Sequence, residues 1–589
     1  MASAPSGASS HRSSKTPKKQ TKPQSGDTNT ITIAKYMKRI LSIAFILAGA
    51  LWVQAQLSAE IDVERTVVPR LEQHAPLPSV VPSLIPWSET PMRLSLSEYT
   101  DAADFSSNPG GLLAPAYTGL RKPSPYRGYV WGGYFPAYNL GVGAGYRFIK
   151  NERTGLGAAV QFDGSSYNAH LPEGLRETVK DNTISLQADF NHTFSEAARL
   201  GAVIGYSHAA LCSPTFGSPE QNQKINDFNA AISLDGLRDH FGYGVKAAIE
   251  RFALGTDIEL GQNTLLTPPS ETIFGLTAGA GGSTADSLFR YRLEAGLDMK
   301  HRTGHFWTGS EFEKIAKNNP MIVSLDPTVG FNLDNFSIDL GAKVDISSNL
   351  TGSSFHVAPR VNVAWTPSSR FAIFARSDGG AEMTDLRHIY NYSPFAPGIL
   401  AYDASFSPVN ARAGFAFGPA GGFSAELYAR YASTRRAPMA AVIGGETPVA
   451  VLATANIKGW GAGLSLGWSC RMASVSGKVE VLQHGLDRGF ADAPDRAGII
   501  AALSARIRPV ERLGIDASWN FRGKRAYALG PQLAGMRNIS TVDLGAEYRI
   551  DERFSAFLRF ENLLARHPEI LPGLTSNGLH GLAGIVFKY

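Results

Sequence analysis

The sequence has few cysteines and, beyond its N-terminal region, no long apolar runs. Only two of the 589 residues are cysteines, Cys212 and Cys470, and neither stands at metal-ligand spacing from another cysteine or a histidine. Beyond residue 55 no apolar run approaches the roughly 18 residues that a membrane-spanning helix needs. The sequence therefore predicts two unrelated small apolar side chains and argues against a bundle of membrane helices.

A basic surface is also lacking. The formal charge of +5 comes from the N-terminal 55 residues, which hold eight of the 56 basic residues and one of the 51 acidic ones. The rest of the chain keeps 48 basic and 50 acidic residues, a net charge of −2. We therefore expect no nucleic-acid partner, because such partners require a basic surface.

The N-terminal region divides into three predicted parts. Residues 1–36 are rich in Ser, Lys, Thr and Pro and are expected to be a disordered upstream extension. Residues 37–55 contain a charged start at Met37, an apolar run and a small-residue cleavage site, which is typical of a signal peptide. Residues 56–124 are rich in proline and predict an extended segment that lies in the periplasm or enters a barrel lumen.

From residue 125 to 589 the dominant feature is a period of two. Leu544, Ala546 and Tyr548 alternate with Asp543, Glu547 and Arg549, and similar segments recur along this whole region. Alternation places successive side chains on opposite faces of a strand. Strands that are apolar on one face and charged on the other suit a wall between lipid and water. The prediction is an all-β fold, a transmembrane antiparallel β-barrel.

Connection lengths give the strand count. Short connections such as Lys150–Gly155 and Pro509–Arg512 alternate with long ones such as Ser433–Val451. The pattern contains 23 candidate strands, but a barrel that starts and ends in the periplasm needs an even number. Treating Leu254–Ser287 as one loop removes the glycine-rich candidate Thr272–Ala280 and predicts about 22 strands, closed by pairing of the last with the first.

A lumen of that width cannot be filled by wall side chains alone. The candidates to occupy it are residues 56–124 and the predicted loops Leu254–Ser287 and Gly380–Phe406. We expect this occupant to keep the intact barrel from conducting as a wide pore.

Both ends of the predicted barrel resemble a known family. The stretch from Gly128 to Leu140, with Gly145 to Phe148 after it, and the stretch from Arg559 to Leu564, followed by Leu571-Pro572-Gly573 and the final strand, resemble TonB-dependent receptor barrels, in particular the plug-poor type common in Bacteroidota. The resemblance implies an integral outer-membrane protein that transports an unidentified solute. It also implies outer-membrane lipid, a TonB-type periplasmic protein or a surface lipoprotein as partners.

Two departures from that family keep an alternative open. Full receptors carry a plug domain before the barrel, whereas this chain offers only Gln56–Ser124 there. Glu64–Val68 is only faintly similar to a TonB box. The alternative is a non-conducting structural or assembly component of the cell envelope.

Charged residues of the C-terminal strands are predicted to face the lumen. They are expected to form either a hydrated, ion-paired wall or a polar permeation path. Both interpretations place them in the lumen, because a Lys or Arg that faces lipid at the midplane costs about 2–4 kcal/mol. These lumen candidates are Arg506, Arg508, Asp516, Arg522, Asp543, Glu547, Arg549, Arg559 and Glu561.

Aromatic residues are predicted in two outer loops, as interfacial girdles or as a sugar-stacking platform. The candidates are Tyr134, Tyr138, Tyr390 and Tyr392. No enzyme activity is expected, because adjacent Ser207 and His208 would point to opposite faces of a strand. His301, His305 and His388 lie in predicted loops or turns without carboxylate partners, so we expect neither a metal nor another cofactor.

Overall fold

The computed structural model describes residues 126–589 with short gaps. The gaps are 137, 152, 171–175, 196–197, 213–221, 239, 256–257, 261–263, 267–268, 286–287, 308–311, 315–318, 350–351, 389–402, 444–448, 487–495, 530–531, 572–573 and 576–577. The predicted segments 1–36, 37–55 and 56–124 lie outside the described residues.

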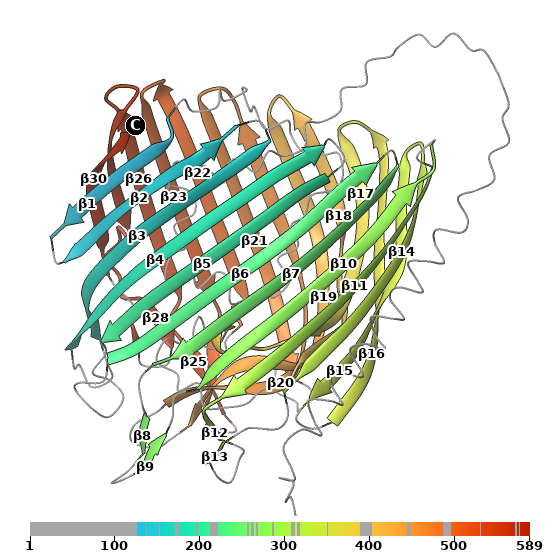
Figure 1. The fold of residues 1–589 in the computed structure, drawn as a ribbon, viewed down its shortest axis with the longest axis horizontal. Helices are drawn as coiled ribbons and strands as arrows, with labels where there is room; N and C mark the ends of the chain where they lie inside the picture. The colour runs from blue at the N-terminus through green and yellow to red at the C-terminus, as the bar shows by residue number, and fades with distance from the viewer. Residues whose placement is uncertain are drawn as a thin grey trace, which may run out of the picture. The chain divides into compact units, whose positions relative to one another are not determined.

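Twenty-two antiparallel strands form a closed wall (Figure 1). They are β1 (Gly128–Phe135), β2 (Asn139–Lys150), β3 (Thr154–His170), β4 (Arg176–Ser195), β5 (Ala198–Cys212), β6 (Asn222–Arg238), β7 (Phe241–Leu254), β10 (Ser270–Ser283), β11 (Phe289–Thr303), β14 (Met321–Leu333), β15 (Phe336–Asn349), β16 (Gly352–Ser368), β17 (Phe371–Glu382), β18 (Ser405–Ala420), β19 (Phe423–Ile443), β20 (Val449–Ser469), β21 (Ala473–Leu486), β22 (Ile499–Val510), β23 (Leu513–Gly523), β26 (Ile539–Arg549), β27 (Phe554–Glu561) and β30 (His580–Lys588).

Shorter strands lie at the rim of the barrel. β24 (Arg525–Leu529) and β25 (Gln532–Met536) form a hairpin that joins the sheet through β19. Three further hairpins are β8–β9 (Ile258–Leu260, Thr264–Leu266), β12–β13 (His305–Trp307, Phe312–Lys314) and β28–β29 (Glu569–Leu571, Leu574–Thr575). None of the helices in the described ranges is long and apolar enough to span a membrane.

The last strand closes the wall against the first. Val130 pairs with Phe587, and Tyr134 pairs with Ala583. The backbone amides of Arg127 and Gly128 both donate to the carbonyl of Tyr589, at 2.8 Å. Closure leaves no open edge, which is required in lipid because each unpaired backbone group costs several kcal/mol.

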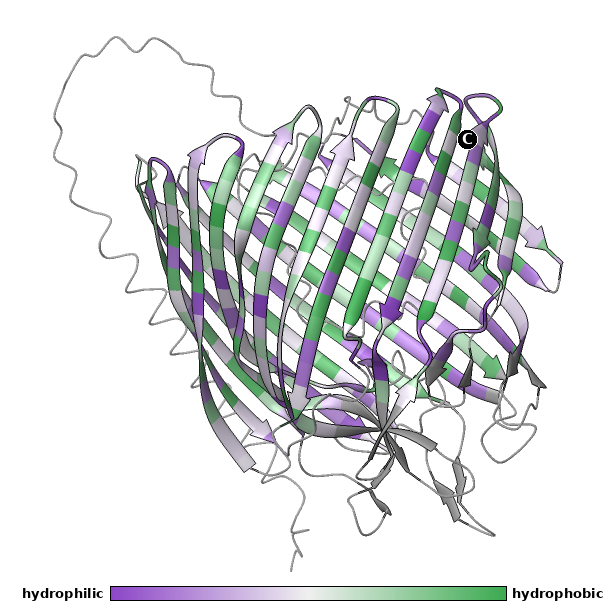
Figure 2. Ribbon diagram, turned by 180° about the vertical axis from the view of Figure 1, so that it is seen from behind, coloured by the Kyte–Doolittle hydropathy of each residue, from purple (hydrophilic) through white to green (hydrophobic). Residues whose placement is uncertain are grey.

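The two faces of the wall differ in polarity. Figure 2 shows apolar and polar residues alternating along the strands. One face exposes large apolar side chains, including Ile204 at 54%, Trp460 at 61% and Ile585 at 56%. The other face carries most of the ion pairs and is the inner one, as the contacts of the candidate site show.

The two ends of the barrel also differ. At the turn end, consecutive strands are joined by short connections such as 151–153 and 511–512, and the chain terminus lies there. Aromatic pairs surround this end, for example the stacked rings of Phe336 and Trp365 and the tilted pair Phe554 and Phe587. Such aromatic girdles mark a membrane interface. The opposite end, which we call the loop end, carries most of the longer connections.

The structure confirms the predicted count of 22 strands and the closure, but not the assignment by which the count was reached, because the candidate strand that was removed belongs to the wall. Thr272–Ala280 is not a loop: it lies within β10, fully paired with β7 and β11. Its glycines Gly275 and Gly279 face inward beside Asp298 and Glu294 of β11, so they pack beneath a neighbour's side chain. Several predicted loops are also shorter than expected, because β3, β4, β19 and β20 extend into them.

Candidate functional site

The segment that follows β17 leaves the wall at a glycine pair. The register of β17 against β18 shifts between Asp378 and Gly380, and Gly380 has φ of 138°, which favours glycine. A Cβ on Gly379 would lie 2.2 Å from the carbonyl oxygen of Ser407. Just beyond, the fully buried carboxylate of Asp345 accepts a 2.7 Å hydrogen bond from the Ala381 amide. Together, the β-bulge and the hydrogen bond to Asp345 fix the point at which the chain leaves the wall.

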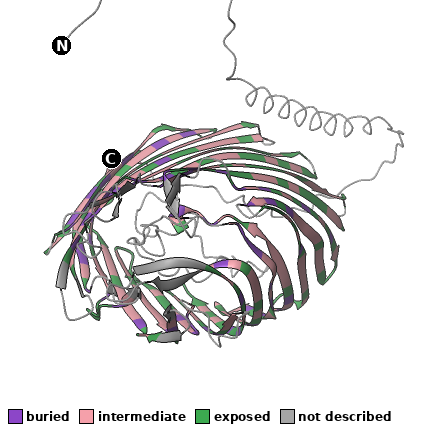
Figure 3. Cartoon of the chain, turned by 90° about the horizontal axis from the view of Figure 1, so that it is seen from below, coloured by how far each residue is buried: buried purple, intermediate pink, exposed green. Residues whose placement is uncertain are grey.

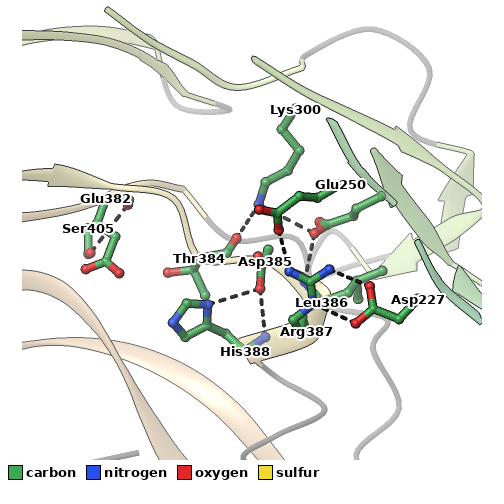
Figure 4. A network of polar contacts seen from close by, with 11 residues as sticks. Asp227, Glu250, Lys300, Glu382, Thr384, Asp385, Leu386, Arg387, His388 and Ser405 are labelled. Atoms are coloured by element: carbon green, nitrogen blue, oxygen red, sulfur yellow. Dashed lines mark hydrogen bonds and ion pairs between the residues drawn. The ribbon is translucent and has the colours of Figure 1, made fainter. Parts of the chain in front are cut away.

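Thr384–His388 then forms what we call the lumen strap (Figure 4). Its last three residues make one helical turn, Leu386–His388. Asp385 caps this turn, since its carboxylate accepts a 2.7 Å hydrogen bond from the His388 amide. The same oxygen lies 3.0 Å from Nδ1 of His388. The strap is therefore locally ordered and presents its backbone and side chains to strands β6, β7, β10 and β11.

A buried charge cluster on β10 and β11 binds the strap backbone. Glu271 accepts a 2.7 Å hydrogen bond from the Leu386 amide and a 2.8 Å bond from Nε of Arg302. Lys300 lies 3.6 Å from Glu271 and donates to the Thr384 carbonyl. Glu271, Lys300 and Arg302 are exposed by 4% or less, and Leu386 by 2%. Buried charges of this kind are tolerated because each one is paired.

Arg387 makes a second attachment, to β6 and β7. Its guanidinium binds both carboxylate oxygens of Asp227, with Nε 3.0 Å from Oδ2, and a third nitrogen donates to Glu250. The planar fork of arginine matches a carboxylate in this two-bond arrangement, which gives directional as well as electrostatic specificity.

The strap bridges an arc of the wall from β17 to β6, and its contacts identify the inner face. In the wall, β17 and β11 are separated by β14, β15 and β16. A segment that leaves β17 and binds β6, β7, β10 and β11 must pass inside this arc (Figure 3). Residues directly paired across antiparallel strands share a face. The face of Asp227, Glu250, Glu271 and Lys300 is therefore the inner face.

A polar cavity lies on the turn-end side of the strap. Its volume is about 930 Å³, and it is lined by β6, β7, β10, β11 and β14 to β17. Ion pairs cross its wall, including Arg290 with Asp339 at 2.8 Å and Arg360 with Asp326. The cavity begins at the short turns and is lined by charged residues, and the strap is attached nearer the loop end of the same strands.

The ionisation of the strap is set by its own pair. Burial raises the pKa of Asp385, but the hydrogen bond and charge of His388 outweigh burial, and the net pKa is lowered. The hydrogen bond that His388 donates to the Asp385 carboxylate raises the pKa of His388. Both changes favour a charged pair.

The lumen candidates predicted from the C-terminal strands fall on this inner face when the register is followed around the wall. Arg506 pairs with Asp516 across β22 and β23, with Nε 2.5 Å from Oδ1. Asp543 accepts from Ser518 and from the Asn562 amide, both at 2.9 Å. Alternation places Arg522, Glu547, Arg549, Arg559 and Glu561 on the same face, and Arg508 is exposed at the turn end. None of them contacts the strap in an interaction described here.

Of the four aromatic candidates, two lie in the described part of the chain. Tyr134 is not in a loop: it lies in β1, on the outward face, because pairing with β2 continues to Phe135. Tyr138 lies in the connection with a positive φ of 63°, and its hydroxyl is 3.4 Å from Asn182. Tyr390 and Tyr392 lie outside the described residues.

His301 is placed differently from the prediction, because it lies within β11 on the outward face, paired with Thr272. His388 lies in the predicted loop, within the strap, but it has a carboxylate partner, Asp385. Within the described ranges, no group of three His, Cys, Asp or Glu residues is arranged to hold a metal ion. Ser207 and His208 of β5 do point to opposite faces, since Ser207 pairs with the inward Asp227.

No protein-family model and no curated protein matches the sequence. Solved structures do match the fold. A mutant of the ferric enterobactin receptor of Pseudomonas aeruginosa is 10% identical over 79% of this chain and 80% of its own, with a TM-score of 0.58. The FrpB iron transporter of Neisseria meningitidis is 12% identical over 80% of this chain and 82% of its own, with a TM-score of 0.60. The ferripyoverdine receptor of the outer membrane of P. aeruginosa is 11% identical over 79% of this chain and 72% of its own, with a TM-score of 0.59.

At these identities the likeness concerns the fold. The chain forms a TonB-dependent receptor-like barrel of 22 strands, as its two ends predicted, and this fold supports an integral location in the outer membrane. With that orientation the turn end faces the periplasm and the loop end faces outward.

Sequence reasoning missed the strap attachment. Glu271 was assigned to a loop, and nothing in the sequence links Arg387 to acids more than a hundred positions away. One signal was available. Asp385, Arg387 and His388 form a charged cluster within a predicted loop that was already a candidate to enter the lumen.

Proposed function

We propose that this protein transports a polar solute across the outer membrane, with the lumen strap as its closed gate. The observation that carries the proposal is the attachment of Thr384–His388 across a wide, charge-lined lumen. A barrel that served only as an anchor would need a filled lumen, but not a charge-lined cavity of about 930 Å³ on the turn-end side of the strap.

The attachment has the properties expected of a gate. It rests on hydrogen bonds and ion pairs to a few side chains, above all Arg387 and Glu271, rather than on a large apolar interface. Polar contacts of this kind exchange with water at a modest net cost, about 0.5–1.5 kcal/mol for an ordinary hydrogen bond and more for a charged one. Release of the strap would connect the outer side with the periplasmic cavity.

The solute class follows from the lumen. Its wall offers charges of both signs, so a polar or charged solute is favoured over a lipid. The proteins of similar fold are named for ferric enterobactin, iron and ferripyoverdine, which makes ferric chelates the first ligands to try in a binding experiment. We propose no catalytic step in the barrel, in keeping with the opposed Ser207 and His208.

The partner that would drive the gate is proposed to be a TonB-type periplasmic protein. The candidate contact is Glu64–Val68, which lies outside the described residues. Co-purification with the periplasmic domain of such a protein, with and without this segment, tests the coupling separately from the gate. Binding that does not depend on Glu64–Val68 would reject that contact.

The gate is tested by conductance. The full chain in a planar bilayer should conduct little, and Arg387→Ala should raise the conductance by freeing one end of the strap. Arg506→Gln, which breaks an ion pair within the wall, is the matched control and should leave the conductance unchanged. A wide, stable pore in the unaltered protein would overturn the gate and favour a general porin. Absence of conductance in both the unaltered protein and Arg387→Ala, together with no solute uptake, would favour the non-conducting structural component.

A further inference from the structure

Three arginines lie side by side on the inner face of β17, β18 and β19. Cross-strand pairing joins Arg376 to Arg412 and Arg412 to Arg430. Directly paired residues share a face, and Arg376 lines the periplasmic cavity, so all three face the lumen. We call these three residues the arginine row. Like charges directly opposite one another destabilise a sheet, so such a row is unfavourable for the wall unless negative charge lies close to it.

Buried aromatic rings hold the row in place. The guanidinium of Arg412 lies 3.4 Å from the centroid of the Tyr428 ring and 6.0 Å from that of Phe374. The guanidinium of Arg376 lies 5.3 Å from the Phe374 centroid. Both rings are buried within the wall. Stacking on an aromatic face orients a guanidinium without neutralising it, so the row is preorganised and keeps its positive charge.

The carboxylates beside the row are shared among several bases. Glu426 accepts a hydrogen bond from Arg412, and Glu480 lies 4.0 Å from Arg430 and 3.3 Å from Lys478. In these contacts two carboxylates serve three basic side chains, and the first arginine of the row adds a fourth positive charge. The Nε of Arg412 is buried and donates no hydrogen bond within the described part of the chain. The cluster therefore favours an additional negative charge.

The row can be reached from the cavity. Arg376 lines the cavity together with Arg360 and Asn362, and Asn362 is its cross-strand partner on β16. Because the cavity begins at the short turns, a solute inside it can meet Arg376 without movement of the strap. Arg412 and Arg430 reinforce the attraction from the neighbouring strands, since partly buried charges are screened less than exposed ones.

The spacing and the side-chain type favour oxyanions. Adjacent strands are about 4.8 Å apart, so the row extends over about 10 Å from β17 to β19. The planar fork of arginine matches a carboxylate or a phosphate with two parallel hydrogen bonds. A solute with several such groups can contact Arg376 with one group while the others are attracted by the rest of the row. A neutral sugar or a cation gains nothing from this arrangement.

We propose that the arginine row binds the transported solute and that this solute is an organic anion with several carboxylate or phosphate groups. The inference rests on the proposed transport function, for which it names the solute class. It does not rest on the strap, because the row is reached from the turn end. Failure of the row and failure of the gate are therefore separate results.

The test is isothermal titration calorimetry of the full-length protein in detergent at low salt. The probes are tricarballylate, which carries three carboxylates, pyrophosphate, and the neutral and cationic controls glycerol and spermidine. The protein should bind tricarballylate, pyrophosphate or both, but neither control, and its preference distinguishes carboxylates from phosphates. Arg376→Gln should weaken the binding about tenfold or more, because it removes the charged fork at the cavity. Binding of neither anion would overturn the proposal.

Two further variants separate charge from folding, and all variants are compared only where their circular dichroism spectra match. Glu426→Gln keeps the shape but removes a negative charge beside the row, so it should tighten anion binding about threefold. Arg506→Gln removes an inward base outside the row and should leave the affinity within about twofold. Unchanged affinity in Arg376→Gln, or weaker binding in Glu426→Gln, would overturn the proposal. Anion binding as expected, without uptake or gated conductance, would support the row and reject the proposed transport.

Discussion

Arg387 forms a two-bond ion pair with Asp227, although 160 positions separate them in the chain. One residue belongs to the lumen strap and the other to β6, which lies seven strands from β17 around the wall, so this contact reports whether the strap is attached. Their side chains are about a quarter exposed, at 26% and 25%, and the pair is therefore partly shielded from water.

We predict energetic coupling between these two residues. In a double-mutant cycle of Asp227→Asn and Arg387→Gln, read from hydrogen exchange of the strap amides, the coupling should be about 1–3 kcal/mol, as expected for a charged hydrogen bond. Glu250 will retain part of the attachment in each single variant. The same cycle at Arg506 and Asp516, which are about half exposed, should give less than about 1 kcal/mol. Additive effects at Arg387 and Asp227 would show that the strap is held by other contacts.

A second prediction concerns Lys300. Its ammonium group is 1% exposed and lies beside Glu271, so Lys300→Met removes a buried charge and leaves the carboxylate with Arg302 and one amide. Breaking a buried pair typically costs about 3–5 kcal/mol. The apparent unfolding temperature should fall clearly, whereas Arg292→Gln, at a position 63% exposed, should leave it nearly unchanged. Equal unfolding temperatures for the two variants would mean that Arg302 alone neutralises Glu271.

The pH dependence of the strap follows from His388. Its pKa is raised above the ordinary value of about 6.5 by the hydrogen bond to Asp385. A raised pKa means that the protonated pair stabilises the ordered strap fully below pH 6.5 and that this contribution is lost as the pH rises through the raised value. Hydrogen exchange of strap amides should therefore accelerate, beyond its intrinsic base catalysis, as the pH rises above about 6.5 and through the raised pKa of His388. His388→Gln should remove this extra pH dependence.

These contacts also show what the sequence could and could not predict. Alternation predicted the wall correctly in strands such as β23 and β26, because one face meets lipid and the other water. It failed in β10, because Gly275 and Gly279 supply no inward side chains. They pack beneath Asp298 and Glu294, and without side chains the alternation is lost and the segment resembles a loop in the sequence. Pairing between neighbouring strands of the wall produces a periodic pattern in the sequence. The ion pair of Arg387 with Asp227 depends on how the closed barrel brings distant strands together, and it produces no such pattern.

The two cysteines provide a topology test. Cys470 lies exposed in the turn between β20 and β21, and Cys212 ends β5 at the opposite side of the barrel. The hydrocarbon layer between the two ends is about 30 Å thick, while a disulfide needs Cα atoms within about 7 Å. No intramolecular bond should form, and a membrane-impermeant maleimide should label Cys470 only after the periplasmic side is opened. Labelling of Cys470 on intact cells, with Cys470→Ser as the control, would invert the proposed orientation.

The sharpest test of inside and outside uses two neighbours in β5. Val203 and Ile204 are similarly exposed in the isolated barrel, at 40% and 54%, but they point to opposite faces. Val203 pairs with Asp189 and Ala231 on the inner face, and Ile204 pairs with Ala188 and Ala230 on the outer one. Arginine on a lipid-facing midplane position costs about 2–4 kcal/mol, whereas arginine in a wet lumen meets water and, here, a carboxylate. Ile204→Arg should therefore lower folding yield into lipid vesicles and the denaturant midpoint, while Val203→Arg should leave both nearly unchanged. In detergent-free refolding the contrast should grow with the thickness of the bilayer, because thicker hydrocarbon keeps position 204 farther from the head groups. Equal penalties at the two positions would contradict the assignment of faces on which the lumen strap and the periplasmic cavity both depend.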